Sequence, residues 1–144
     1  MAFVLDCSVT MAWIFPDEAT EATNQLRGSL VGGRAFAPSL WPVEVGNVLL
    51  TATRRQRIRV SEWPQIQASL AALPIETDAV SPSRVWGKSL ELAQTHQLSV
   101  YDAMYLELAT RLQLPLATLD GALRTAAQSL GLAAPPAPLH AATK

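Results

Sequence analysis

Short apolar runs alternate with segments of helical periodicity along this chain of 144 residues. Four runs are short enough to be buried strands, at residues 2–5, 34–38, 74–77 and 115–120. Strands that alternate with helices predict a parallel sheet that is covered by helices on both faces. We therefore expect an α/β fold with a central parallel sheet of four or five short strands.

The segments between these runs predict helices, at residues 8–15, 18–30, 39–57, 61–73, 83–97, 99–113 and 121–131. Ser39 and Ser61 are expected to cap two of them, because serine favours the N-cap position. Each is followed three residues later by a proline, which fits the first turn of a helix because its missing N–H removes no hydrogen bond there.

The length of the chain is sufficient for one hydrophobic core, and no linker indicates a second domain. We expect a single domain over residues 1–132 and a flexible tail, rich in Ala and Pro, over residues 133–144. The composition, 49% hydrophobic and 16% charged, is typical of a globular protein. Its net charge of −1 argues against sequence-blind binding to nucleic acid, although not against a local basic strip.

The apolar runs and the cysteine content predict the cellular compartment of the protein. None approaches the ~18 residues that span a bilayer, and no basic residues precede the first run as in a signal peptide. The single Cys7 cannot form an internal disulfide, which agrees with a reducing compartment. We expect a cytoplasmic protein without a membrane partner.

Four acidic residues occupy places that this fold would bring together. Asp6 and Asp120 directly follow strand runs, at the carboxyl end of the sheet, where functional sites of parallel sheets collect. Glu44 and Asp102 lie in early turns of predicted helices. Two carboxylates about 4 Å apart repel by about 4 kcal/mol at an effective dielectric near 20, so a cluster must share protons, form salt bridges or bind a cation. We interpret the four as a divalent metal site.

Each acid also has an ordinary explanation. Asp6 and Asp120 could cap the helices that follow them, and Asp102 lies three residues after Ser99, the spacing of a capping box. Glu44 is harder to explain this way, because it borders the apolar stripe of its helix: Trp41, Val45, Val48, Leu49 and Ala52. We favour the metal site because four independent caps need not point to one place. The other eight acids, Glu107 among them, are predicted to face solvent.

Three polar residues beside these acids are candidates for supporting the site: Ser8, Asn47 and Thr118. Ser8 could orient a water at the site, or it could only cap its own helix. Thr118 shares a strand face with Asp120 and could donate to a carboxylate, or it could be an ordinary strand threonine. Asn47 lies one turn beyond Glu44 on the same side of the helix, which predicts a lined pocket rather than a solvated surface.

The motifs DCS, VEVGN, YDAMYLELA and LATLD, taken in this order, resemble the PIN domain, and more narrowly the VapC toxins of prokaryotic toxin–antitoxin pairs. The similarity extends from about Ala2 to about Gly131, and the four motifs together are specific although each is short. The resemblance implies a PIN-like fold and an acidic quartet that holds Mg²⁺ or Mn²⁺, formed by Asp6, Glu44, Asp102 and Asp120 and supported by Ser8, Asn47 and Thr118. It also implies metal-dependent cleavage of RNA, a homodimer and inhibition by a VapB-like antitoxin.

The residue types favour metal-assisted hydrolysis over a covalent nucleophile. No histidine is placed as an obvious general base, and the cysteine and the serines have no evident histidine partner. Carboxylate oxygens suit a hard ion such as Mg²⁺. We expect Asp6 and Asp102 to be the nearest ligands, with Glu44 and Asp120 binding through water or completing a second site. The sequence leaves open whether one or two ions bind.

One dense group of positive charge ends the helix that carries Glu44: Arg54, Arg55, Arg57 and Arg59. Their ordinary role is favourable placement at a helix C-terminus together with solubility. The functional alternative is contact with RNA phosphates or with an acidic partner. Trp13, Ile14 and Phe15 are candidate contacts for an antitoxin or a second subunit.

Other functions fit the residues less well. Haloacid-dehalogenase-like phosphatases place a second aspartate two residues after the nucleophile, where this chain has Ser8. Receiver domains need a lysine after a late strand, and neither Lys88 nor Lys144 is so placed. Two alternatives stay open, namely a catalytically idle PIN-like interaction module and a PIN nuclease of RNA processing that has no antitoxin.

Overall fold

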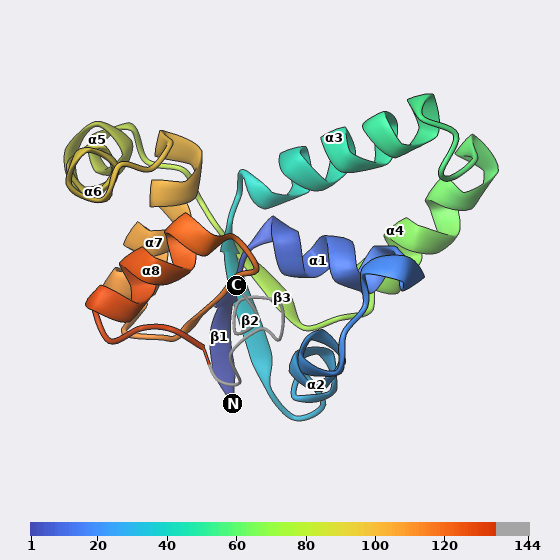
Figure 1. The fold of residues 1–144 in the computed structure, drawn as a ribbon, viewed down its shortest axis with the longest axis horizontal. Coiled ribbons are helices and arrows are strands. Elements are labelled where there is room, and N and C mark those ends of the chain that lie inside the picture. Colours follow the sequence, from blue (N-terminus) through green and yellow to red (C-terminus); the bar gives the residue numbers. More distant parts are fainter. Residues whose placement is uncertain (135–144) are drawn as a thin grey trace.

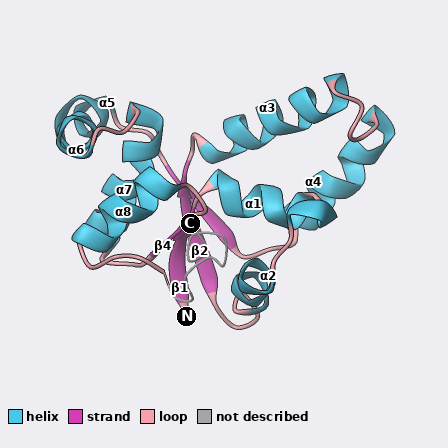
Figure 2. Cartoon of the chain, in the orientation of Figure 1, coloured by secondary structure: helices cyan, strands magenta, loops and turns pink. Residues whose placement is uncertain are grey.

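Four parallel strands form a sheet at the centre of the computed structural model, which describes residues 1–134 (Figure 2). The sheet has the order β3-β2-β1-β4, from the strands β1 (Ala2–Leu5), β2 (Arg34–Pro38), β3 (Ile75–Asp78) and β4 (Leu116–Ala117). Ala2 pairs with Arg34 of β2, and Val4 pairs with Leu116 of β4. The predicted α/β class and parallel sheet are confirmed.

Strand β1 lies in the middle of the core, because apolar side chains point to both of its faces. Phe3, Val4 and Leu5 are completely buried, as expected for a strand inside a parallel sheet. The chain passes from β1 to β2 on one side, whereas β4 pairs with β1 on the other side. A crevice at the carboxyl ends of the strands is expected at such a reversal, and Asp6 follows β1 directly there.

Helices on one side of the sheet carry the chain into a long arm (Figure 1). The helices α1 (Cys7–Ile14) and α2 (Glu21–Gly28) pack against each other, with a 3₁₀ turn at Pro16–Glu18 between them. The arm consists of α3 (Trp41–Arg54) and α4 (Trp63–Ala71). The predicted apolar stripe of α3 packs inward, with Trp41, Val45, Leu49 and Ala52 buried.

Helices on the other side form a second lobe (Figure 1). One continuous helical stretch comprises α5 (Pro82–Arg84), a π-helical turn (Val85–Ser89) and α6 (Leu90–His96). The helix α7 (Val100–Leu112) contacts β1 and β2, and α8 (Gly121–Ser129) contacts α7 and β4. Because α7 packs directly on the sheet, its first turn brings Asp102 to the carboxyl ends of the strands.

Both predicted serine caps are wrong. The hydroxyl of Ser39 accepts a hydrogen bond from the N–H of Val80 at 3.1 Å, and α3 begins only at Trp41. Ser61 lies inside a 3₁₀ turn, Val60–Glu62, that precedes α4. In both places the chain makes a further turn before the helix begins, so the cap is displaced from the serine.

Two other predicted boundaries differ from the structure. The second helix begins at Glu21 rather than at residue 18, because Thr20 caps it by accepting from the N–H of Thr23 at 3.1 Å. Of the predicted strand at residues 115–120, only β4 pairs in the sheet. The following residues leave the strand and contribute side chains to the candidate site.

The first two residues of the expected tail pack against the last strand. Ala133 bridges to Leu116, and the N–H of Ala134 donates to the carbonyl of Leu116 at 3.1 Å. Residues 135–144 of the expected tail lie outside the described residues. Within residues 1–134, no helix is both long enough and apolar enough to cross a membrane.

Candidate metal centre

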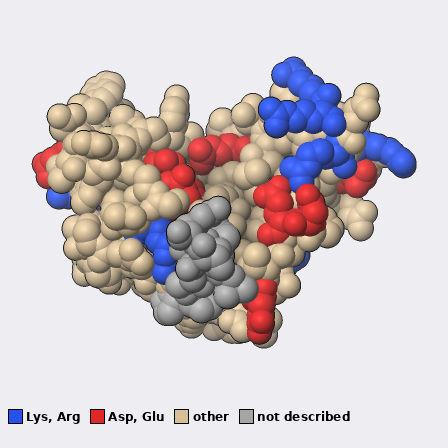
Figure 3. Space-filling view, in the orientation of Figure 1, with Lys and Arg blue, Asp and Glu red and all other residues tan. Residues whose placement is uncertain are grey.

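The four predicted acids lie near one another at the carboxyl end of the sheet. Glu44 lies close enough to Asp6 and Asp102 for their charges to raise its pKa, and Asp6 and Asp120 act on Asp102 in the same way. Acidic side chains flank the hollow between the α3 arm and the lobe formed by α7 and α8 (Figure 3). The prediction that these acids lie together therefore agrees with the structure.

Asp6 is the most buried of the four, with 6% of its surface exposed. Its Oδ2 accepts hydrogen bonds from the hydroxyls of Ser8 at 2.7 Å and Thr118 at 2.8 Å. Burial raises the pKa of Asp6 above its ordinary value, and these two hydrogen bonds oppose that shift. The side chain is therefore held in one orientation by groups that stabilise its ionised form.

Ser8 and Thr118 connect Asp6 to the loop after β4. The Ser8 hydroxyl accepts from the N–H of Leu119 at 2.9 Å, and the Thr118 hydroxyl accepts from the N–H of Asp120 at 3.0 Å. Because a hydroxyl has one proton, accepting from these backbone groups leaves that proton for Asp6. Thr118 thus donates to a carboxylate, which was one of its two predicted alternatives. Ser8 contacts Asp6 itself, a contact that neither of its predicted alternatives named.

Glu44 is held from the opposite side of the site by a residue that sequence reasoning missed. The hydroxyl of Tyr105, on α7, donates a short hydrogen bond to Oε1 of Glu44. Burial raises the pKa of Glu44, the hydrogen bond opposes this shift, and the charges of Asp6 and Asp102 add to it. In the sequence, Tyr105 could have been identified by its position three residues after Asp102, which places it on the same side of the helix.

Asp102 and Asp120 lie at the N-terminal ends of two helices, α7 and α8. The N–H of Asp102 donates to the hydroxyl of Ser99 at 3.1 Å. Ser99 therefore caps α7 through the backbone of Asp102. Burial, with the charges of Asp6 and Asp120, raises the pKa of Asp102 to about 6. Asp120 accepts from the N–H of Leu123 at 2.8 Å, so it caps α8 as its ordinary explanation predicted, while it also faces Asp102.

Asn47 lies apart from this network. Its side chain is exposed and lines a groove between α1 and α3 together with Met11, Val48 and Arg55. Among residues 1–134, no hydrogen bond joins its amide to any of the four acids. Its predicted supporting role stays a prediction.

The donor set of the site fits a hydrated divalent cation. No Lys, Arg or His in the described part of the chain forms an ion pair with any of the four acids. In that same part, no three Asp, Glu, His or Cys side chains are close enough to hold an ion by direct bonds alone. Mg²⁺ binds oxygen ligands and keeps several waters, so carboxylates that face one another without closing into a cage are compatible with it.

Of the remaining acids, Glu107 contradicts the prediction that it faces solvent. Only 7% of its surface is exposed, and it accepts from Arg111 at 2.8 Å. Arg111 also bonds to Asp78 at 2.7 Å, where the guanidinium lowers the pKa of the aspartate. The prediction failed because Arg111 neutralises Glu107 one turn away, which permits burial on α7.

The predicted arginine group divides into different environments. Arg57 pairs with Asp17 at 3.2 Å and Glu18 at 3.1 Å, and its guanidinium lies 4.0 Å from the centre of the Phe15 ring. The other three are exposed on the surface: Arg54, Arg55 and Arg59. Arg57 therefore has a structural role, whereas contact of the others with RNA or a partner stays a prediction.

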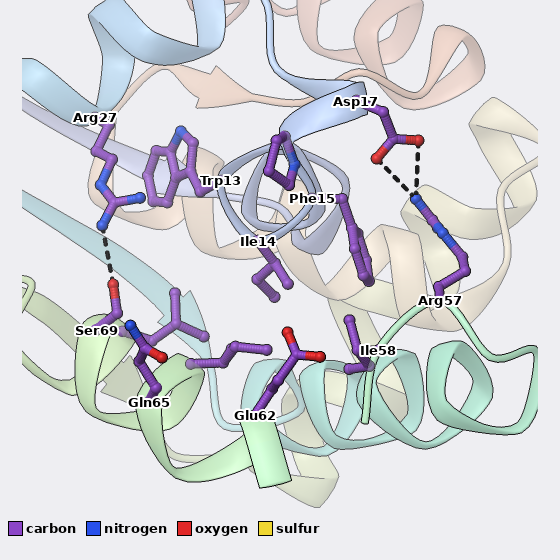
Figure 4. Close-up of a pocket in the computed structure, with 13 residues that line it drawn as sticks. Trp13, Ile14, Phe15, Asp17, Arg27, Arg57, Ile58, Glu62, Gln65 and Ser69 are labelled. Carbon is purple, nitrogen blue, oxygen red and sulfur yellow. Dashed lines mark hydrogen bonds and ion pairs between the residues drawn. The ribbon is translucent and has the colours of Figure 1, made fainter. Parts of the chain in front are cut away.

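A cavity of about 380 Å³ lies away from the four acids, between α1 and α4 (Figure 4). Trp13, Ile14 and Phe15 form one of its walls. Arg57 closes one end of this wall through Asp17, and Arg27 bonds to Ser69 of α4 at the other end, at 3.1 Å. The cavity thus combines an apolar wall with a polar rim.

Comparisons with known proteins agree with this fold. The PIN domain model matches residues 3–128. Ribonuclease VapC1 from two strains of Mycobacterium tuberculosis, CDC 1551 / Oshkosh and ATCC 25618 / H37Rv, is 36% identical over 101 residues, which cover 70% of this chain and 74% of the relative. The crystal structure of PAE2754 from Pyrobaculum aerophilum aligns with a TM-score of 0.59 at 18% identity, over 88% of this chain and 84% of the other.

Proposed function

Because the chain belongs to the PIN domain family, we propose that it is a divalent-metal-dependent ribonuclease that acts as the toxin of a VapBC-type toxin–antitoxin pair. The observation that carries the proposal is the group of four carboxylates at the end of the sheet. The charges of Asp6 and Asp102 help to raise the pKa of Glu44, and those of Asp6 and Asp120 help to raise the pKa of Asp102. No Lys, Arg or His among the described residues forms an ion pair with any of the four. Such a site stores electrostatic repulsion that a bound cation relieves.

Each acid would contribute to holding Mg²⁺ or Mn²⁺ from a fixed position. Asp6 and Asp102 are the proposed nearest ligands, with Glu44 and Asp120 binding through water or completing a second site. Ser8 and Thr118 keep Asp6 oriented by donating to it. A bound ion would supply the positive charge that stabilises an attacked phosphodiester and makes a water more acidic.

The proposed partners follow from two surfaces outside the group of four acids. Arg54, Arg55 and Arg59 are proposed to contact RNA phosphates or an acidic partner, since they are exposed at the end of the arm. The wall of Trp13, Ile14 and Phe15 offers a VapB-like antitoxin an apolar contact. We also propose a homodimer and a cytoplasmic location, the latter supported by the free thiol of Cys7.

The test replaces single acids and measures both cleavage and metal uptake. Asp6→Asn and Asp102→Asn should each reduce Mn²⁺-dependent RNA cleavage on the order of 100-fold, the scale for removing one electrostatic group from an active site. Both should weaken Mn²⁺ binding in calorimetry while circular dichroism stays unchanged. The matched control is Glu91→Gln, an exposed acid on α6 that pairs with Lys88.

Full activity of either site variant would refute the assignment. A wild-type protein that neither cleaves RNA nor takes up Mn²⁺ would instead favour the idle interaction module. Cleavage that continues unchanged in EDTA would exclude the metal.

A further inference from the structure

We infer that Tyr105 is a positioning residue that fixes the Glu44 carboxylate at the candidate metal centre. The inference rests on the proposed function, and it assigns to the tyrosine a role in orienting the Glu44 carboxylate rather than in the chemical step. Its basis is one hydrogen bond, from the Tyr105 hydroxyl to Oε1 of Glu44. The two residues are 61 positions apart in the chain.

The burial of Tyr105 makes this contact obligatory. The tyrosine has no exposed surface, so no solvent water reaches its hydroxyl from the surface, and a buried hydroxyl without a partner would destabilise the fold. Glu44 is only half-buried, and its carboxylate accepts the hydrogen bond from the Tyr105 hydroxyl. A hydrogen bond to an ionised carboxylate is stronger than one between neutral groups, so the contact holds a side chain that otherwise rotates freely.

The contact also determines which oxygen of Glu44 serves the site. Oε1 accepts the hydrogen bond from the tyrosine, so Oε2 is the oxygen left available to a cation, in a carboxylate close enough to Asp6 and Asp102 for their charges to raise its pKa. Tyr105 lies three residues after Asp102, on the same side of α7. One helix therefore supplies one acid of the site and orients a second acid that comes from the opposite arm (Figure 1).

If the role of Tyr105 were purely structural, the same hydrogen bond would only anchor α3 to the rest of the fold. The chain offers a matched contact that separates the two explanations. The hydroxyl of Thr10, on α1, is completely buried and accepts from Nε1 of Trp41 at 3.0 Å. Trp41 is on α3, as is Glu44, so the Thr10 hydroxyl anchors the same helix through a hydrogen bond that involves no carboxylate.

The experiment compares Tyr105→Phe with Thr10→Val by titration of each protein with Mn²⁺ in a calorimeter. Tyr105→Phe keeps the buried ring and removes the hydroxyl, and we expect about 10-fold weaker Mn²⁺ binding, the scale for loss of a group that orients a metal ligand. Thr10→Val should bind Mn²⁺ as the wild type does, even if it unfolds at a lower temperature. In the background of Glu44→Gln, Tyr105→Phe should cause no further loss.

Each outcome decides one question. If the wild type takes up no Mn²⁺, the proposed function fails. If the wild type binds Mn²⁺ and Asp6→Asn does not, whereas Tyr105→Phe binds as tightly as the wild type, only the positioning inference is overturned. Equal weakening by Tyr105→Phe and Thr10→Val would also overturn it, because anchoring of α3 would then explain both.

A spectroscopic measurement keeps the inference testable should Tyr105→Phe not fold. Labelling Tyr105 with 3-fluorotyrosine keeps both the ring and the hydroxyl. Because that hydroxyl donates to a proposed metal ligand, saturation with Mg²⁺ should shift its fluorine resonance. A resonance that does not move between metal-free and saturated protein would overturn the inference.

Discussion

Asp102 combines partial burial with two neighbouring negative charges, and this combination determines how it ionises. Burial raises its pKa from 3.8 to about 6, and Asp6 and Asp120 contribute to the shift. The folded chain therefore binds this proton more tightly than the unfolded chain does. Between pH 4 and pH 6, the folded state holds more protons than the unfolded state, so raising the pH through this range lowers the free energy of unfolding.

Replacing Asp102 should consequently stabilise the metal-free protein, although it removes a functional group. At pH 7, Asp102→Asn should raise the free energy of unfolding by about 1 kcal/mol after allowance for solvent screening, or the melting temperature by about 3 °C. At pH 4 the gain should vanish, since the wild-type carboxyl is then protonated. Scanning calorimetry in EDTA at both pH values checks this. An equal gain at pH 4 and pH 7 would contradict the assigned ionisation.

At the scale of elements, the arm formed by α3 and α4 depends on contacts at its turn. Arg57 follows the end of α3 and reaches back to the end of α1, where it pairs with Asp17 and Glu18 and lies over Phe15. Exposed ion pairs contribute little singly, but a cation over an aromatic ring adds to them. The sequence grouped Arg57 with its neighbours by spacing alone, whereas its partners come from about 40 residues earlier.

Arg57→Ala should lower the free energy of unfolding by about 1 to 2 kcal/mol, because it removes both ion pairs and the ring contact. Arg57→Lys should lose part of this stability, since lysine keeps the charge but not the planar group that stacks on the ring. Arg54→Ala, an exposed neighbour on the same arm, is the control and should change stability by less than about 0.5 kcal/mol. Urea denaturation measures all three, and equal midpoints for the two alanine variants would contradict the role of Arg57.

At the scale of the whole molecule, large apolar side chains remain on the surface of the lobe formed by α5 to α7. Trp86 is 74% exposed and Leu90 is 50% exposed, and they are four residues apart on one helical stretch. Residues at this spacing face the same side of a helix. Exposed apolar groups that gather on one side indicate an interaction surface, which supports the proposed homodimer.

Trp86→Glu combined with Leu90→Glu should convert the dimer to a monomer, because charges at an apolar interface are left without partners. Analytical ultracentrifugation gives the mass, and circular dichroism verifies the fold. The control is Val31→Glu, which is also highly exposed but lies in the turn between α2 and β2. A wild type that sediments as a monomer, or a double variant that keeps the dimer mass, would contradict this surface.

The features that the sequence determined by itself depend on residues close together in the chain. The alternation of strand runs and helical faces predicted the α/β class, and the apolar stripe of α3 predicted its buried side. The four acids were identified because three of them end a strand run or begin a helix, where parallel topology brings segments together. Such patterns depend on residues within one or two turns of each other, so a single sequence contains them.

The tertiary structure alone decided which groups these residues contact. Thr118 reaches Asp6 across 112 positions, and Tyr105 reaches Glu44 across 61. Arg111 neutralises Glu107 and at the same time binds Asp78 of β3, so an acid predicted to face solvent is buried. The physical reason is that hydrogen bonds and burial depend on distances between elements, and packing of α3 on α1 and of α7 on the sheet sets those distances.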